Sequence, residues 1–123
     1  MMKQTMETHE EESSGFVSEA AGPPGIFGVF EDDGETGYLY LYEPGGREVF
    51  QHLHIYDRSA RLRVREEDVR VLWSKDQSKC GVLIWEKMRG IVNLQTGQEG
   101  RVWLEGRDTP GIGDREWLRG FEI

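Results

Sequence analysis

The chain has 123 residues, 37% of them hydrophobic and 31% charged, which is enough for one hydrophobic core and therefore one domain. Its net charge of −8 opposes general affinity for phosphate backbones and argues against a nonspecific nucleic-acid binder. Cys80 is the only cysteine, so no intrachain disulfide forms. The acidic N-terminus lacks a signal-peptide pattern and no apolar run is long enough to span a membrane, so we expect a cytoplasmic protein without membrane contact.

Residues 1–25 are rich in Glu, poor in apolar side chains, and end in Gly-Pro-Pro-Gly. Such a segment buries too little surface to offset its conformational entropy. We therefore expect a disordered acidic tail over residues 1–25 and a single β domain over residues 26–123.

The first structural element expected in this domain is a β-hairpin. Two apolar stretches, residues 26–30 and 38–42, flank an acidic turn at residues 31–37. Gly34 and Gly37 lie in this turn, where a positive φ is usually required. The sequence therefore predicts two antiparallel strands joined at the turn.

The second of these strands alternates aromatic and aliphatic residues. Tyr38, Tyr40 and Tyr42 fall on one face, and Leu39 and Leu41 on the other. Three aromatics on one face are usually packed, but the same face is a binding surface if nothing covers it.

A third strand is expected over residues 49–56. Strict alternation places four residues on each face: Phe50, His52, His54 and Tyr56 on one, Val49, Gln51, Leu53 and Ile55 on the other.

Further strands are predicted at residues 69–73, 79–85, 90–94 and 101–104, with a short edge strand at 62–65. Trp73 is expected to be a core anchor and Cys80 a buried, inert thiol. Asp114 is a candidate N-cap for a short final helix through Leu118. About seven strands in sequential hairpins predict an all-β fold, mainly an antiparallel meander curled into a small sandwich or open barrel.

Two resemblances accompany this pattern. Trp73-Ser74-x-Asp76-x-x-Lys79, followed by an apolar strand and a strand ending in Leu94-x-Thr96-Gly97, is similar to one blade of the bacterial WSPDG-type β-propellers. The chain is too short for the four blades of a closed propeller, so this resemblance implies only a four-stranded meander.

The second resemblance covers about Val29 to Leu94. The block FEDDGETGY-x-Y, then Leu53-His54-Ile55-Tyr56 and the Trp73 motif, resembles a family of small uncharacterised bacterial proteins, a domain of unknown function. The family pattern has Ala where this chain has His52. No activity is established for the family, so the resemblance transfers no catalytic residue.

The candidate binding surface combines acidic and aromatic residues. Aromatic side chains dominate interface hot spots, and carboxylates attract a basic protein. Its members are Asp32, Asp33, Glu35, Tyr38, Tyr40 and Tyr42.

The alternative is a metal- or small-ligand-binding β-barrel. His52-x-His54 places two imidazoles on one strand face, which is how cupin-type barrels present metal ligands. Against it, these histidines are more simply explained as half-exposed residues flanked by Phe50 and Tyr56, and the acidic turn lacks EF-hand spacing.

Enzyme signatures are missing from the sequence. There is no G-x-S-x-G nucleophile elbow and no phosphate-binding G-x-x-x-x-G-K-[ST] loop. A stripe of arginines at 58, 61, 63, 65 and 70 is expected to pair with neighbouring acids or lie in solvent. The expectation is a non-enzymatic protein-binding module, including the immunity type, with no cofactor.

Overall fold

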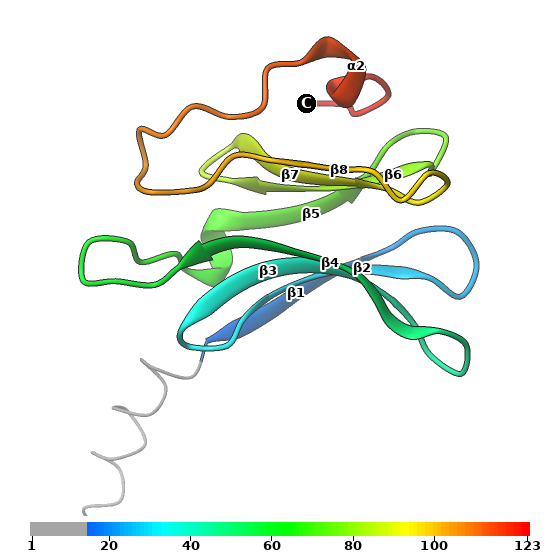
Figure 1. The fold of residues 1–123 in the computed structure, drawn as a ribbon, viewed down its shortest axis with the longest axis horizontal. Helices are drawn as coiled ribbons and strands as arrows, with labels where there is room; N and C mark the ends of the chain where they lie inside the picture. Colours follow the sequence, from blue (N-terminus) through cyan, green and yellow to red (C-terminus); the bar gives the residue numbers. More distant parts are fainter. Residues whose placement is uncertain (1–14) are drawn as a thin grey trace, which may run out of the picture.

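Two four-stranded antiparallel sheets pack face to face in the structure, a computed structural model that describes residues 15–123 (Figure 1). Sheet A follows the order β1-β2-β3-β4 and sheet B the order β5-β6-β7-β8. The elements are β1 (Phe16–Ala21), β2 (Phe27–Asp32), β3 (Thr36–Glu43), β4 (Glu48–Asp57), the 3₁₀ turn η1 (Glu66–Asp68), β5 (Val69–Trp73), β6 (Lys79–Ile84), β7 (Lys87–Asn93), β8 (Glu99–Arg101) and α2 (Arg115–Leu118). The predicted antiparallel meander is confirmed, in its sandwich form.

The tail predicted for residues 1–25 is wrong over its second part. Phe16–Ala21 forms β1, which pairs with β2 from Phe16↔Asp32 to Ala21↔Phe27. Its alternate residues, beginning with Phe16, turn toward the core. This inward face is small, which is why the acidic composition concealed it. The disorder predicted for residues 1–14 lies outside the described residues.

The hairpin between β2 and β3 is confirmed, but its two glycines serve different purposes. Gly34 has φ 99° and donates its N–H to Asp32 Oδ1 at 2.8 Å. Gly37 has no positive φ. A Cβ at Gly37 would lie 2.4 Å from Tyr56 Cζ and 2.9 Å from Phe30 Cζ, so Gly37 is required by packing.

Strand β4 departs from the predicted facing because two bulges interrupt it. Tyr38 pairs with His54 and Gly37 with Tyr56, which leaves Ile55 as an extra residue. The second bulge is at Gln51, which has φ 58°. Each bulge shifts the alternation by one residue.

The bulges move two aromatic rings from the predicted face to the core. Tyr56 is fully buried, and Phe50 packs against the core cluster. His52 and His54 remain on the outer face, and Val49 joins them there. The prediction that Phe50, His52, His54 and Tyr56 share one face is therefore wrong for the two aromatic residues.

Sheet B is the four-stranded meander that the sequence implied. Trp73, at the end of β5, is half-buried and donates its indole N–H to Ala20 O of sheet A at 3.0 Å. Cys80 on β6 is fully buried, and Gly28 of β2 approaches it so closely that a Cβ there would lie 2.2 Å from the sulfur. Burial raises the pKa of the Cys80 thiol, which fits the inert role predicted for it.

Two strand predictions are corrected. Residues 62–65 form no strand, although Leu62 and Val64 do point into the core. The last strand is Glu99–Arg101, shorter and earlier than the predicted 101–104. The seven main strands predicted from the sequence omit β1, which brings the observed number to eight.

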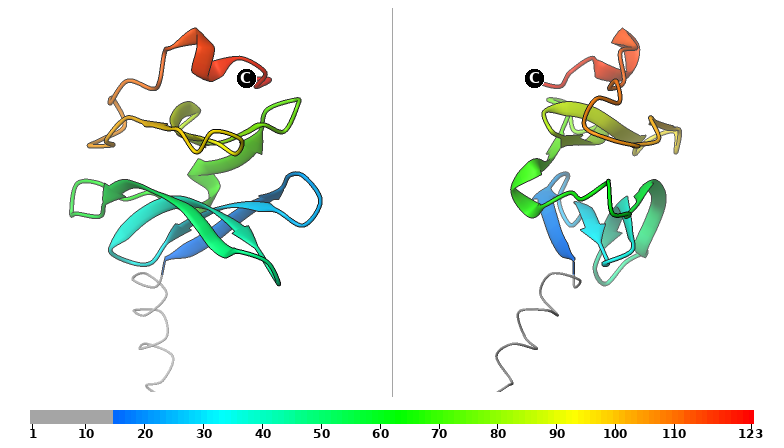
Figure 2. Two further views of the ribbon diagram at one scale, coloured as in Figure 1. Left: turned by 45° about the vertical axis from the view of Figure 1, so that its right-hand side comes forward. Right: turned by 90° about the vertical axis from the view of Figure 1, so that its left-hand side faces the viewer.

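The chain after β8 covers the outer face of sheet B (Figures 1 and 2). Phe121 packs with Leu83, Met88 and Ile91 in a second apolar cluster on this face. The short helix α2 begins as predicted, with Asp114 Oδ1 accepting a hydrogen bond from Glu116 N at 2.8 Å. Sheet B is therefore covered on both faces.

Candidate functional site

The outer face of sheet A carries most of the residues that the sequence singled out. Cross-strand pairing arranges this face in three rows: Val17–Glu31–Tyr38–His54, Glu19–Val29–Tyr40–His52 and Ala21–Phe27–Tyr42–Val49. We call these twelve residues the outer face of sheet A. Val17 and Val49 are 51% and 50% exposed, so large apolar side chains reach solvent at two corners.

The three tyrosines are half-buried and form the middle of this face. Their rings lie on the side of β3 opposite the fully buried Leu39 and Leu41. Tyr40 donates its hydroxyl to Glu31 Oε1 at 3.1 Å, and the rings of Tyr38 and Tyr40 lie 6.1 Å apart. The sequence left open whether this face is core or surface, and the structure shows a partly exposed surface.

Two phenols of this face, those of Tyr38 and Tyr40, hold their protons more tightly than an ordinary tyrosine, because their pKa values are raised. Burial, followed by the charge of Glu31, raises the pKa of Tyr40 to about 12. Burial and the charges of Glu31 and Asp33 also raise the pKa of Tyr38. The face therefore offers neutral hydroxyl groups and aromatic rings beside negative carboxylates.

The three predicted carboxylates separate into two environments. Asp33 and Glu35 are exposed in the turn between β2 and β3. Asp33 Oδ1 accepts hydrogen bonds from Thr36 N and Glu35 N, which lower the pKa of Asp33.

Asp32 is not a surface residue, because it is 1% exposed. Tyr56 donates its hydroxyl to Asp32 Oδ2 at 2.6 Å, and Arg58 Nη1 lies 3.8 Å from Asp32 Oδ1. The Asp32 carboxylate thus joins β2 to the end of β4 within the fold. Glu31, one residue earlier, takes its place on the outer face.

His52 and His54 lie on the same face, as predicted, but they make different contacts. The His52 ring lies 4.5 Å from the ring of Tyr38 and 6.2 Å from that of Tyr40. His54 Nε2 lies 2.8 Å from Asp57 Oδ1, and the His54 ring contacts Trp103 edge-on at 5.0 Å.

This arrangement does not assemble a metal centre. Within residues 15–123, no group of three or more His, Cys, Asp or Glu side chains is placed to hold a metal ion. Carboxylates of the acidic turn bond to their own turn or to tyrosines rather than converging on the two imidazoles.

Sequence reasoning missed the two exposed valines of the outer face of sheet A and the exposed Trp103 that lies beside it. Val17 was assigned to the tail, Val49 was placed on the opposite face, and Trp103, 37% exposed beside His54, was assigned to a strand that does not form there. Only Val17 had a usable signal, since Val17, Glu19 and Ala21 alternate with three residues that pack inward.

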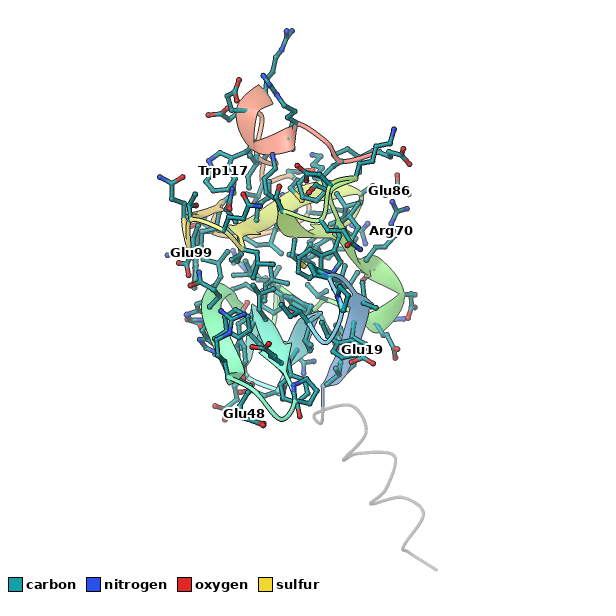
Figure 3. All side chains as sticks on the ribbon, turned by 90° about the vertical axis from the view of Figure 1, so that its right-hand side faces the viewer. Glu19, Glu48, Arg70, Glu86, Glu99 and Trp117 are labelled. Atoms are coloured by element: carbon teal, nitrogen blue, oxygen red, sulfur yellow. The ribbon has the colours of Figure 1, made fainter. Side chains whose placement is uncertain are left out.

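A recess of about 620 Å³ lies at another part of the molecule, between α2 and two turns of sheet B. Glu99 and Trp117, which lie on the same side of the sandwich in Figure 3, are among its lining residues. Lys79 of the tryptophan motif is buried here and donates Nζ to Glu116 O at 2.9 Å and Trp117 O at 3.0 Å. Its role in the described contacts is to hold α2 on sheet B.

The arginine stripe is mostly a solvated surface. Arg61, Arg63 and Arg65 are exposed and alternate with the buried Leu62 and Val64. The predicted alternation of exposed and buried residues is present over residues 61–65, but this segment does not pair with a strand. Among the described helices, none is long and apolar enough to cross a membrane.

Comparison with known proteins gives a family and no activity. No curated protein and no solved structure matches the chain. One family profile matches residues 12–100, a span that includes all of sheet A and ends within β8, before the covering C-terminal segment. The resemblance to a family of small uncharacterised bacterial proteins is thereby confirmed. Since the match covers most of the sequence, the chain belongs to the family described as uncharacterized protein conserved in bacteria (DUF2251).

Proposed function

We propose that this protein is a non-enzymatic binding module that docks a basic protein segment on the outer face of sheet A. The observation that carries the proposal is a difference between the two outer faces of the sandwich. The apolar face of sheet B is covered by the chain's own residues around Phe121. The outer face of sheet A, with exposed Val17 and Val49 and half-exposed tyrosines, has no such cover within residues 15–123.

The side chains of this face match those of protein interfaces. Tyrosines supply large, rigid contact areas at low entropic cost, and they dominate interface hot spots. Tyr38, Tyr40 and His52 lie in ring contact, so part of the face is already ordered before binding. Preordered side chains reduce the entropy lost on association.

Charge indicates the nature of the partner. Glu19 and Glu31 lie on the face, and Asp33 and Glu35 border it in the turn. A lysine or arginine side chain placed there meets carboxylates and aromatic rings together. A second copy of this chain, with net charge −8, would be repelled, and so would the Glu-rich residues 1–14.

The test begins with selection of displayed peptides on the full chain and measurement of their affinities by calorimetry. We expect the selected peptides to be enriched in Arg and Lys. Tyr38→Ala should weaken their binding by about tenfold or more, which is typical of an interface tyrosine. Glu31→Gln should also weaken binding, because it removes the charge and keeps the length of the side chain.

Glu66→Gln is the matched control, since Glu66 is an exposed carboxylate in η1, outside this face. Neutral or acidic selected peptides, or equal effects of Glu31→Gln and Glu66→Gln, would contradict the proposal. Dimerisation that Tyr38→Ala abolishes would identify a second copy as the occupant. Tighter peptide binding by a chain lacking residues 1–14 would identify that segment as a competitor.

The narrower form of the proposal is an immunity-type role, in which the basic partner is a toxin. It predicts that co-expression protects a host from the product of a neighbouring gene, and that Tyr38→Ala abolishes the protection. A partner that is harmless when expressed alone would contradict the immunity-type role but not the docking of a basic segment on sheet A.

A further inference from the structure

Arg89 is a fully buried cation without a matching anion. It lies on β7 at the irregularity in the β6–β7 pairing and is 0% exposed. Its Nε donates to Ile84 O at 3.1 Å, and its Nη1 donates to Thr109 O. Its Nη2 is buried and has no hydrogen-bond partner.

No carboxylate of the described residues lies within ion-pair distance of Arg89. Burial alone lowers the pKa of the guanidinium, with no neighbouring carboxylate opposing the shift. A buried charge is costly unless it is paired, and an orphaned donor adds to that cost. Backbone carbonyls satisfy part of the hydrogen bonding but supply no net negative charge.

A second orphaned donor lies in the turn between β6 and β7, four residues before Arg89. Trp85 follows Ile84, the residue whose carbonyl binds Arg89, and has φ 53°. Its indole Nε1 is also buried without a partner. Arg107 places its guanidinium 4.6 Å from the centre of the Trp85 ring, so a second cation lies at this end of the sandwich.

We propose that this end of the sandwich binds a small oxyanion, with Arg89 Nη2 and Trp85 Nε1 as donors and Arg107 adding positive charge. Guanidinium groups recognise carboxylate and phosphate oxygens through paired N–H donors, and such charge-assisted bonds are the strong ones. A free phosphate and a carboxylate group share this chemistry. The site is separate from the outer face of sheet A, so this proposal stands or falls independently of the docking function.

Entry of the anion requires the segment around Thr109 to move, because Arg89 is fully buried and its Nη1 is bonded to the carbonyl of this segment. The segment that contains Thr109, between β8 and α2, forms no helix or strand. The exposed carboxylates of Glu86, Glu105 and Asp108 lie on the same turn and loop and oppose an approaching anion. We therefore expect millimolar affinity, with a preference for small anions.

The test is thermal unfolding of the full chain at fixed pH and ionic strength while phosphate or acetate replaces chloride. Anion binding to the folded state should raise Tm along a saturating curve, from which an apparent Kd follows. Excluded salts also stabilise proteins but do so without saturation, so the shape of the curve separates the two effects. Stabilisation by phosphate alone would indicate a free inorganic anion, and stabilisation by acetate as well would indicate a carboxylate-bearing ligand.

Trp85→Phe removes the indole N–H and keeps an aromatic ring. It should raise the apparent Kd by about tenfold, as expected for the loss of one hydrogen bond to a charged acceptor. Trp103→Phe is the matched control, because Trp103 contacts His54 instead. Arg89→Lys keeps a charge and removes the forked donors, so it should abolish saturation if it folds. A curve without saturation in the parent chain, or equal behaviour of Trp85→Phe and Trp103→Phe, would overturn the proposal.

Discussion

Two positions of the β2–β3 hairpin require glycine, and the reasons differ between them. Glycines of one hairpin looked equivalent in the sequence, yet Gly34 satisfies a backbone requirement and Gly37 a packing requirement. Turn chemistry is local, so Asp33-Gly34 could be recognised from neighbouring residues. The contact of Gly37 with Tyr56 spans 19 positions and depends on a bulge, and no local pattern encodes it.

Gly37→Val should lower the free energy of unfolding by about 3 kcal/mol or more, because overpacking forces buried rings to move. Gly34→Ala should cost about 1–2 kcal/mol through backbone strain alone. Urea denaturation measures both. Equal costs for the two substitutions would mean that Tyr56 and Phe30 yield readily to an added methyl group.

The raised pKa of Tyr40 predicts that the folded state loses stability at alkaline pH. Its folded pKa of about 12 lies above the ordinary tyrosine value of 10.0, so the folded state holds the proton more tightly. The associated stabilisation is complete below about pH 10 and is lost as pH rises toward about 12. Urea midpoints measured between pH 9 and pH 11.5 should fall, and the fall should be shallower for Tyr40→Phe. An unchanged slope in that variant would assign the alkaline loss to other groups.

At the scale of elements, strand β1 shows how a short segment escapes prediction and still matters. Its Phe16 ring contacts Phe30 at 6.1 Å, and Ala20 O accepts the indole N–H of Trp73 from the opposite sheet. Removing residues 1–24 should therefore lower Tm by more than about 5 °C, or roughly a kcal/mol or more for a domain of this size. A chain that starts at residue 15 keeps these contacts and is the matched comparison. Equal Tm values for the two truncations would show that β1 contributes nothing to stability.

Lys79 should act as the fastening point of the C-terminal segment. Lys79→Met keeps most of the buried stem and removes the donors to Glu116 O and Trp117 O. Hydrogen exchange should then accelerate at Lys75 and Ile112, whose amides bond to Gly120 O and Met88 O at this interface. Lys75→Met is the control, because the Lys75 side chain is exposed. Acceleration spread evenly over both sheets would instead mean global destabilisation.

For the whole molecule, periodicity and turn residues were sufficient to predict an all-β meander, since these signals are local. Two features of the candidate surface were beyond their reach. The bulges of β4 reversed the facing of Val49, and the burial of Asp32 depends on Tyr56 arriving from a distant strand. Whether the tyrosine face is covered depends on how the sheets and the C-terminal segment pack together. Local sequence patterns do not encode that packing.

The overall charge should also govern how a partner approaches. With net charge −8, the association rate constant for a basic peptide should fall as salt is added, while the dissociation rate changes less. Stopped-flow measurements at about 20 mM and 300 mM NaCl, separated by a large change in screening length, would show this. A rate constant independent of salt would point to a purely apolar contact.

The order of strands along the chain has a consequence for biosynthesis. All four strands of sheet A lie before residue 58, and those of sheet B lie after residue 68, so the first sheet can leave the ribosome complete while the second is still being made. During that interval Phe30, Leu39 and Leu41 have no opposing sheet. Sheet A of the nascent chain therefore exposes apolar side chains on both of its faces. At roughly 5–20 residues per second the interval lasts a few seconds. Slow codons that are read while only sheet A has emerged would lengthen this exposure and should raise the aggregated fraction, whereas the same codons placed within β1, which are read before sheet A has emerged, should have little effect.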